Sequence, residues 1–460
     1  MSGDLLLRPH FEPGRAGVGL GHVGRCVALG EAWTHHGGRA RLVAVGLPEP
    51  WAARCRAARI TVVDSPHEPA PESPPGHRWV VLDGYQTTLE DQASVRADGS
   101  RLLVIDDHGS VGTYDADLIL DQNLGADPAC YPQSIPTLVG PAFLLMRREF
   151  AVQHRPLAPA VERAVLAPGG HPTDAVASFF GRVAAELAAG GVDVDQLTGV
   201  DDVAGRLAAA DVGFAAAGTT AYELTAVGTP SVLVAVAANQ EPVAARLADI
   251  GAAVSLGPID RLEPIDGARA VADLLADPSR RGRLAANGRR LVDGQGALRV
   301  AAHMRAQDIR LRLAEPDDSE QVWHWANDPE TRANSFSPEP IPWEDHQRWF
   351  ARQLSDPDRL LLMADIDHHQ LGQIRFDLAD GRAVVSFSLM PSARGFGWGA
   401  PLLIAGTRLL WSTRPGTVID GHVKPGNAGS TTSFDRAGFT RLPADGSGSD
   451  TAATFRLERP

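Results

Sequence analysis

A histidine within a cluster of glycines is the first feature that could carry chemistry. Gly17 to Arg25 reads Gly-Val-Gly-Leu-Gly-His-Val-Gly-Arg and lies between a short apolar strand, Leu5–Leu7, and a helix that apolar spacing predicts from about His22 to Trp33. The first amide groups of a helix and the positive end of its dipole favour a phosphate or a carboxylate. A neutral imidazole at this point could act as a general base, so His22 is our first catalytic candidate.

The glycine spacing also matches a dinucleotide fingerprint, Gly-x-Gly-x-x-Gly from Gly19, but two features argue against nicotinamide dinucleotide binding. About nine residues separate the strand from the glycines, whereas the fingerprint follows its strand almost at once. The second expected strand, Ala40–Val45, is followed by Gly46-Leu47 instead of an acid that would bind ribose. A glycine-rich turn with a chemically idle His22 is the remaining alternative.

The composition predicts a soluble globular protein with several domains. The chain has 460 residues and a net charge of −13, and a prior of ~150 residues per domain suggests about three domains. The negative charge argues against nucleic acid as a main partner. Cys26, Cys55 and Cys130 have no Cys-x-x-Cys spacing, so we expect neither a metal site nor a disulfide framework. No apolar stretch reaches the ~18 residues of a membrane span, so we expect a cytoplasmic protein without membrane contact.

Residues 1–155 alternate apolar strands with helices or loops, which predicts a Rossmann-like α/β domain with a parallel sheet. Polar residues follow two further strands, in the runs Asp83-Gly84-Tyr85 and Asp106-Asp107-His108. We interpret the two successive acids as helix caps and loop hydrogen-bond acceptors, not as metal ligands. The expected strands are Leu5–Leu7, Ala40–Val45, Ile60–Val63, Trp79–Leu82, Leu102–Ile105, Leu118–Leu120 and Thr137–Val139.

Residues 156–306 repeat the pattern after a proline-containing connection, which predicts a second Rossmann-like domain. The run Gly218-Thr219-Thr220 at a predicted helix start suits a phosphate, and Glu223 could accept hydrogen bonds from both hydroxyls of a ribose. Ordinary helix capping is the structural alternative. Asn239-Gln240 adds neutral amides after the next strand. The expected strands are Ala164–Ala167, Val212–Ala215 and Ser231–Val236.

Residues 307–460 have a different character, which predicts a mixed α+β domain with antiparallel strands. Six of the nine tryptophans lie here, and we assign most of them to the core. The run Arg394-Gly395-Phe396-Gly397-Trp398-Gly399 separates an expected strand, Val384–Met390, from an expected helix, Ala400–Leu410. Such a turn presents consecutive N–H groups to a pyrophosphate. Asn427 follows another expected strand, Val418–Val423.

Several runs of the first 300 residues together carry a family resemblance: Gly19-Leu20-Gly21-His22-Val23-Gly24-Arg25, Asp83-Gly84-Tyr85, Ile105-Asp106-Asp107, Leu120-Asp121-Gln122-Asn123, Gly140 to Phe150, Gly218 to Glu223, and Asn239-Gln240. They resemble the UDP-2,4-diacetamido-2,4,6-trideoxy-β-L-altropyranose hydrolases of pseudaminic acid biosynthesis, relatives of GT-B glycosyltransferases such as MurG. The resemblance implies a GT-B-like pair of Rossmann-type domains and a metal-free, inverting hydrolysis in which His22 activates water and Tyr85 lies near the sugar. It implies UDP-sugar binding by Arg8, Gly19, Gly21, Arg25, Asp83, Gly218, Thr219, Thr220, Glu223, Asn239 and Gln240.

Two departures leave the exact sugar open. The family's Arg-x-Asp reads Arg8-Pro9-His10 here, and its Gly-Gly-Thr-Asp reads Gly169-Gly170-His171-Pro172. An acid expected near each wall of the crevice is therefore missing.

Residues from about 308 to 460 resemble the GNAT acetyltransferase superfamily through the glycine-rich turn, an Asn-x-x-Ser-x-x-x-Phe run and Gly438-Phe439. The resemblance implies acetyl-CoA as cosubstrate, bound by Leu389, Arg394, Gly395, Gly397, Trp398, Gly399 and Asn427. Phe434 stands where many relatives have the tyrosine that protonates the leaving thiolate. Ser433, His422 or water must replace that tyrosine, and the sequence does not choose among them.

The two resemblances predict a bifunctional enzyme of pseudaminic acid (nonulosonic acid) biosynthesis. The C-terminal domain would acetylate the 4-amino group of a UDP-4-amino-4,6-dideoxy sugar, and the N-terminal pair would release UDP and the free 2,4-diacetamido sugar. The alternatives are a GT-B glycosyltransferase with a fused sugar-modifying acetyltransferase, and a non-catalytic sugar-nucleotide binding protein. The oligomeric state is left open.

Overall fold

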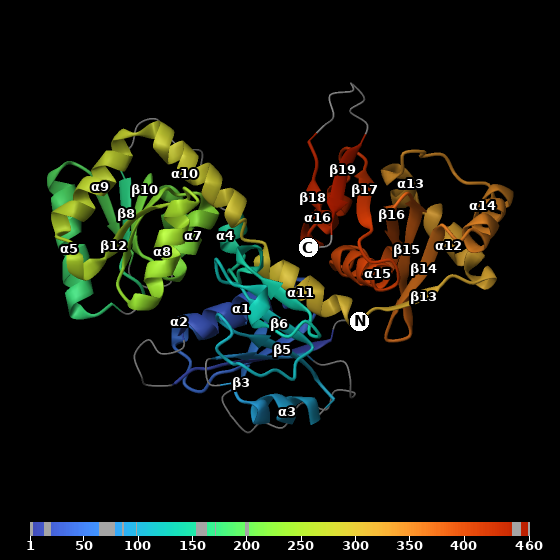
Figure 1. Ribbon diagram of the computed structural model, residues 1–460, viewed down its shortest axis with the longest axis horizontal. Helices are drawn as coiled ribbons and strands as arrows, with labels where there is room; N and C mark the ends of the chain where they lie inside the picture. The colour runs from blue at the N-terminus through green and yellow to red at the C-terminus, as the bar shows by residue number, and fades with distance from the viewer. Residues whose placement is uncertain are drawn as a thin grey trace. The chain divides into compact units, whose positions relative to one another are not determined.

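The computed structural model describes residues 3–12, 20–63, 79–84, 87–97, 99–152, 163–170, 172–197, 202–443 and 452–458. The chain divides into two compact units, and Figure 1 labels many of their helices and strands. The first, the N-terminal unit, comprises Gly3–Thr34 and Arg39–Ala297. The second, the C-terminal unit, comprises Leu298–Pro460 together with the short segment His35–Gly38.

The N-terminal unit contains two parallel sheets, of which the first has the strand order β3-β2-β1-β4-β5-β6-β7. Its central strands β1, β4, β5 and β6 contain nearly continuous buried apolar runs, as expected where a parallel sheet is covered on both faces. The order reverses between β1 and β4, so the carboxyl ends of these two strands form a topological switch point. The strands are β1 (Asp4–Pro9), β2 (Arg39–Val43), β3 (Ile60–Val63), β4 (Trp79–Asp83), β5 (Arg101–Ile105), β6 (Leu118–Asp121) and β7 (Thr137–Val139).

Helix α1 (Leu20–His35) packs closely on this sheet because it carries a glycine at the contact. A Cβ atom at Gly30 would lie 2.7 Å from Ile60 Cδ1 and 3.0 Å from Leu7 Cδ1. Helix α3 (Leu89–Ala97) contributes Val95 to an apolar cluster that also contains Leu6 of β1 and residues of β4 and β5. The remaining helices of this part are α2 (Glu49–Ala57) and α4 (Glu149–Val152).

The second sheet has the order β12-β11-β10-β8-β9, also parallel, and reverses between β8 and β10. Alternate residues of each strand serve opposite faces: Leu166 packs with α5 and α9, whereas Val165 packs with α6, α7 and α8. The strands are β8 (Arg163–Ala167), β9 (Asp193–Gln196), β10 (Val212–Ala216), β11 (Ser231–Ala235) and β12 (Val254–Pro258). The helices are α5 (Asp174–Ala189), α6 (Val203–Ala209), α7 (Thr219–Val227), α8 (Glu241–Asp249), α9 (Pro264–Ala276) and α10 (Pro278–Leu291).

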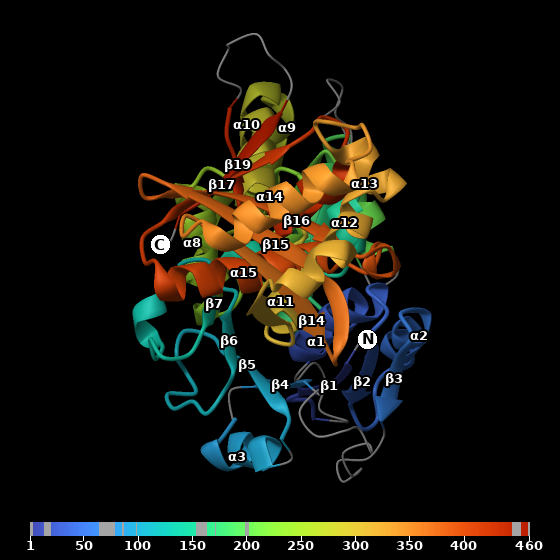
Figure 2. The ribbon, with the colours of Figure 1, turned by 90° about the vertical axis from the view of Figure 1, so that its right-hand side faces the viewer.

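The C-terminal unit is built on a mixed sheet with the order β13-β14-β15-β16-β17-β19-β18, of which Figure 2 labels β14 to β17 and β19. Among its described strands, only β16 and β17 pair in parallel. Leu362 and Ala364 of β14 pack on the side of α15, while Leu361 and Met363 pack with α12 and α14. The strands are β13 (Arg310–Leu313), β14 (Arg359–Ile366), β15 (His369–Ala379), β16 (Arg382–Leu389), β17 (Val418–Val423), β18 (Thr440–Arg441) and β19 (Ala453–Leu457). The helices are α11 (Gly296–Ala306), α12 (Ser319–Ala326), α13 (Pro329–Asn334), α14 (Trp343–Ser355), α15 (Gly399–Thr413) and α16 (Ala428–Arg436).

The expected α/β architecture with parallel sheets, followed by a mixed domain, is confirmed. The short strands β9, β12, β18 and β19 were not expected from the sequence. The GT-B relationship and the domain boundaries at 155/156 and 306/307 stay predictions. Among the described helices, none has the length and apolar character needed to cross a membrane.

Candidate active sites

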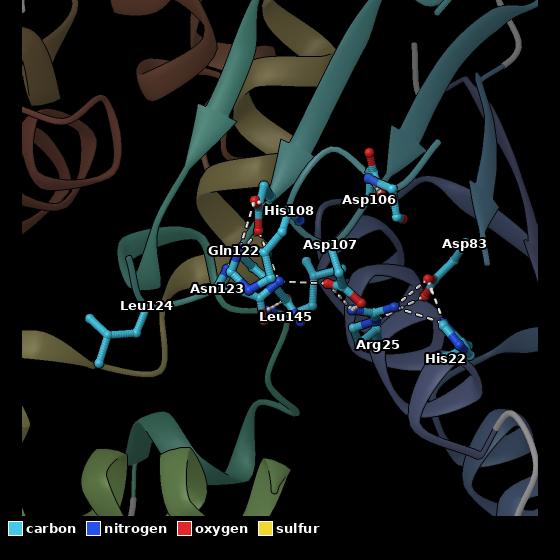
Figure 3. Close-up of polar contacts among 12 residues, drawn as sticks. His22, Arg25, Asp83, Asp106, Asp107, His108, Gln122, Asn123, Leu124 and Leu145 are labelled. Atoms are coloured by element: carbon cyan, nitrogen blue, oxygen red, sulfur yellow. Dashed lines mark hydrogen bonds and ion pairs between the residues drawn. The ribbon is translucent and has the colours of Figure 1, made fainter. Parts of the chain in front are cut away.

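His22 lies at the switch point of the first sheet, where it contacts Asp83 (Figure 3). It belongs to the first turn of α1, the helix that follows β1, and Asp83 is the last residue of β4. His22 Nδ1 is 2.7 Å from Asp83 Oδ1, and the Asp83 side chain has no exposed surface. With Nδ1 donating to this carboxylate, Nε2 keeps a lone pair and can accept a proton, as a general base must.

Arg25, one turn further along α1, neutralises the same carboxylate. Its Nη2 donates to Asp83 Oδ1 at 2.6 Å, and its Nη1 donates to Asp107 Oδ1 at 3.0 Å. Although burial opposes the charge, the two carboxylates raise the pKa of Arg25 above its usual value. Arg25 Nη2 is also 2.7 Å from His22 Nδ1. One nitrogen cannot both donate to Asp83 and accept from Arg25, and we favour the bond to Asp83 because its acceptor is charged and buried.

The polar network continues along the carboxyl edge of the sheet through Asp107. Asn123 Nδ2 donates to Asp107 Oδ1 at 2.6 Å (Figure 3). The same nitrogen donates to Asp121 Oδ1 at 2.8 Å. Asp121, at the end of β6, also accepts from the Tyr131 hydroxyl at 2.8 Å. Asp106 takes no part in these bonds and accepts from the backbone of Ser110 at 3.1 Å, as the interpretation of loop hydrogen bonding predicts.

The sequence gives no sign that Asp107 is a partner of Arg25, because 82 residues separate the two. The sequence likewise gives no sign that Arg147 is a partner of Glu223, because 76 residues separate these two. No local spacing signals either pair. Within the described residues, no group of three or more His, Cys, Asp or Glu side chains is arranged to hold a metal ion.

Other residues expected at the sugar lie around His22. Arg8 is on β1 opposite Leu82 of β4, and Gly21 is exposed at the start of α1 with open space beside it. His10, which stands where the family has an acid, has its ring centroid 6.5 Å from that of His22. Tyr85 and Gly19 lie outside the described residues.

The residues expected to bind UDP lie at the switch point of the second sheet. Gly218 is the N-cap of α7, Thr219 is exposed and Thr220 is partly exposed. Glu223 Oε1 accepts from Arg147 Nη2 at 3.2 Å. Burial raises the pKa of the Glu223 carboxyl, and Arg147 partly opposes this effect.

The two amide residues after β11 differ in their surroundings. Asn239 is exposed, whereas Gln240 Oε1 accepts from the backbone N–H of Val236 at 3.1 Å. A Cβ at Gly218 would lie 3.5 Å from Gln240 Nε2, so Gln240 is next to the start of α7.

In the C-terminal unit, the strands beside the glycine-rich turn separate as their residues approach it. β16 and β17 pair from Arg382 to Val385, but β16 continues to Leu389. The backbone of this last part of β16 is therefore not used in pairing with β17. Gly395 and Gly397 have φ values of +78° and +71°, which only glycine adopts without strain. Gly399 begins α15.

The side chain of Arg394, in this turn, bonds to residues of α13 and to Asp328, the N-cap of that helix. Its Nη1 bonds to Asp328 and lies 3.2 Å from Glu330 Oε2, and its Nη2 donates to Thr331 Oγ1 at 2.9 Å. Asp328 in turn caps α13. The guanidinium thus ties the turn to α13.

Asn427 caps α16 by accepting from Ser430 N–H at 3.0 Å. Phe434 is buried against other aromatic rings, with the Phe455 ring 5.3 Å away. Ser433 is adjacent to the turn, because a side chain at Gly399 would collide with its Oγ. His422 is exposed and 3.2 Å from Thr454 Oγ1.

An open pocket of about 530 Å³ lies between α12 and the end of β16. It combines aromatic and polar groups, which suits a polar organic molecule with an apolar face. Its lining is Gln321, Trp323, His324, Trp325, Asn327, Asp328, Met390, Pro391 and Ser392.

Residues 308–440 match the family model described as acetyltransferase (GNAT) domain, and this segment is a GNAT acetyltransferase domain. Similar solved structures include aminoglycoside acetyltransferase AAC(6')-Ib in complex with coenzyme A (19% identity, 33% of this chain, 95% of that chain, TM-score 0.30). Another is spermidine N-acetyltransferase from Vibrio cholerae in complex with CoA and spermine (13% identity, 33% of this chain, 95% of that chain, TM-score 0.30). A third is a domain from Methanocaldococcus jannaschii DSM 2661 (16% identity, 33% of this chain, 98% of that chain, TM-score 0.29). No curated protein matches the chain.

Proposed function

We propose that the protein is a bifunctional enzyme of nonulosonic acid biosynthesis, in which an acetyl-CoA-dependent N-acetylation precedes hydrolysis of a UDP-sugar. The acetyltransferase would convert a UDP-4-amino-4,6-dideoxy sugar into its N-acetyl product. The N-terminal unit would then release UDP and the free 2,4-diacetamido-2,4,6-trideoxy sugar. The observation that carries the hydrolase part is the contact between partly buried His22 and buried Asp83 at the switch point of the first sheet.

In the acetyltransferase step, the turn around Gly395 and Gly397 would bind the pyrophosphate of acetyl-CoA through its N–H groups. The end of β16 at Leu389, which pairs with β15 but not with β17, would hold the pantetheine arm and polarise the thioester carbonyl. The pocket between α12 and the end of β16 is lined in part by Met390, the residue after Leu389, and is the site we assign to the amine acceptor. The amine attacks the thioester, and acetyl replaces one of its protons as CoA leaves.

In the hydrolytic step, Nε2 of His22 would remove a proton from water as the oxygen attacks C1 of the sugar. The bond between C1 and the phosphate oxygen breaks with inversion, and its electrons leave with UDP. The buried Asp83 carboxylate stabilises the imidazolium that forms. The amides at the start of α7 would stabilise the leaving phosphate, and Glu223 would hold the ribose.

The placement of Asp83 and Arg25 modifies the role that the family resemblance implies for them. Both side chains are engaged with each other and with His22 or Asp107. We therefore propose that they orient His22 and do not contact the sugar directly.

Substitution of His22 tests the division of labour between the units. We expect His22→Ala to lower UDP release by at least ~100-fold, the usual range for loss of a general base, and to leave CoA release unchanged. Both products would be measured in the full chain with acetyl-CoA and the UDP-4-amino sugar, without a glycosyl acceptor.

His108→Asn is the matched control, because His108 lies at the same sheet edge without contacting Asp83 and asparagine tolerates its φ of +60°. It should release both products at the wild-type rate. Loss of both products in His22→Ala, or of neither, would contradict the proposal. UDP release that requires a second sugar acceptor would indicate a glycosyltransferase.

A further inference from the structure

A buried arginine lies behind the glycine-rich turn and comes from outside the segment that matches the acetyltransferase family. Arg305 is near the end of α11, three residues before that segment begins. It is 3% exposed, and its guanidinium carbon is 3.7 Å from the centroid of the Trp398 ring. Its Nη1 donates to the carbonyl oxygen of Phe396 at 2.8 Å. Arg305 therefore contacts two residues of the turn.

The hydrogen bond to Phe396 sets the direction of a peptide group within the turn. In a trans peptide the C=O and the N–H point in opposite directions. Because the carbonyl of Phe396 points toward α11, the N–H of Gly397 points away from α11. The contact thus fixes a donor on the opposite side of the turn.

The charge of Arg305 is only partly compensated. Within the described part of the chain, Nη2 of Arg305 has no hydrogen-bond partner. Burial lowers the pKa of Arg305 to about 10, with Asp308 opposing the shift, so the side chain stays protonated at pH 7. A buried cation without a full set of partners is costly, and a nearby anion relieves that cost.

We propose that Arg305 is a positioning residue for the pyrophosphate of the acyl-CoA cosubstrate, so that α11 forms part of the cosubstrate site. The guanidinium acts from behind the turn in two ways: it orients the peptide between Phe396 and Gly397, and its positive charge attracts the anion bound on the other side. This inference rests on the proposed use of acetyl-CoA by the GNAT domain.

Calorimetric binding of two ligands to the full-length protein tests the inference. Coenzyme A and 3'-dephospho-coenzyme A both contain the pyrophosphate, but only the first has the 3'-phosphate. Arg305→Gln should weaken both by the same factor, on the order of tenfold, the size expected for losing one charge near an anion in a partly buried site. Arg305→Met, which keeps the apolar contact with Trp398, should give the same loss. Arg305→Lys, which keeps the charge, should lose less.

Arg408 supplies the matched control, because it contacts α11 from α15, the helix that follows the glycine-rich turn. It is on α15, and its Nη2 is 2.9 Å from Nδ1 of His303 on α11. Arg408→Gln should leave binding of both ligands unchanged, so a general loosening of the helix pair is separated from the effect of Arg305.

Wild-type affinity in both Arg305→Gln and Arg305→Met would overturn the inference. Loss of affinity for coenzyme A alone would also overturn it, because the charge would then serve the 3'-phosphate. Equal losses in the Arg408 control would assign Arg305 a structural role only. If the wild-type protein binds neither ligand, the proposed acetyltransferase function itself fails.

Discussion

At the scale of single residues, Asp83 decides which nitrogen of His22 is available for chemistry. Its buried carboxylate accepts from Nδ1, so the lone pair of the neutral ring lies on Nε2, and Arg25 donates to the same carboxylate. A carboxylate in this position both orients an imidazole and stabilises its protonated form. The proposed base is therefore a pair of residues.

Replacing Asp83 by asparagine should impair hydrolysis although His22 is intact. The neutral amide cannot stabilise the imidazolium, and its NH₂ group can hold His22 in the wrong tautomer. We expect kcat for UDP release to fall at least ~100-fold, below the ~10⁴-fold effect of the corresponding change in a serine protease triad. Rates of UDP and CoA release by the same sample provide the measurement.

Asp106→Asn is the matched comparison, since Asp106 is also a buried aspartate at a strand end but, among the described residues, its side chain bonds only within its own loop, to Ser110, Val111 and Tyr114. It should retain UDP release, and CoA release should be unchanged in both variants. Normal hydrolysis by Asp83→Asn would remove the carboxylate from the mechanism.

At the scale of elements, α16 and the start of α15 bring Ser433 next to the glycine-rich turn. The Ser433 hydroxyl packs against Gly399 and donates to Gly429 O at 2.8 Å. Phe434, the neighbouring residue, is enclosed by aromatic rings and has no group that could donate a proton. Of the candidates for protonating the thiolate, Ser433 is the side chain that the fold places against the turn.

Ser433→Ala should therefore lower kcat for acetyl transfer about tenfold, toward the lower end of the effect of a lost proton donor, with little change in KM for acetyl-CoA. Initial rates of CoA release at varied acetyl-CoA concentration provide the measurement. His422→Ala should behave as wild type, because His422 is exposed and contacts Thr454 on β19. The reverse pattern would assign the role to His422.

Elements with strong local patterns were predictable, and those defined by tertiary pairing were not. The apolar runs of β4, β5 and β6 predict buried strands from the sequence alone. The glycine-rich turn before α15 is predictable because its motif is contiguous in the sequence. By contrast, β9 reads Asp-Val-Asp-Gln, and its two aspartates give it little β-strand preference. It lies at the edge of its sheet and is defined by its pairing with β8. The two-residue strand β18 exists only through its pairing with β19.

Some residues of the candidate site were likewise predictable from local sequence, whereas their partners were not. His22 and Gly218 were predictable because each follows a strand and begins a helix. The pairing of Arg25 with Asp107, and of Glu223 with Arg147, depends on which strands become neighbours in the folded sheet. Neither partner could be chosen from spacing along the chain.

At the scale of the whole molecule, we propose that two units of one chain carry out successive reactions. The GNAT domain supplies the acetyltransferase, and the N-terminal unit places a histidine–carboxylate pair and a helix start at the switch points of its two parallel sheets. Acetylation changes the 4-amino group, whereas hydrolysis breaks a bond at C1, so the two reactions need separate sites. The central claim is that water activated by His22 attacks C1.

The fate of solvent oxygen tests this claim most directly. The full-length protein would be incubated with acetyl-CoA and the UDP-4-amino sugar in oxygen-18 water, and the released sugar and UDP would be analysed by mass spectrometry at times short enough to limit exchange at C1. We expect the label in the sugar and none in UDP, together with one CoA for each UDP released. Label in the phosphate of UDP would show attack at phosphorus and would contradict the role of His22.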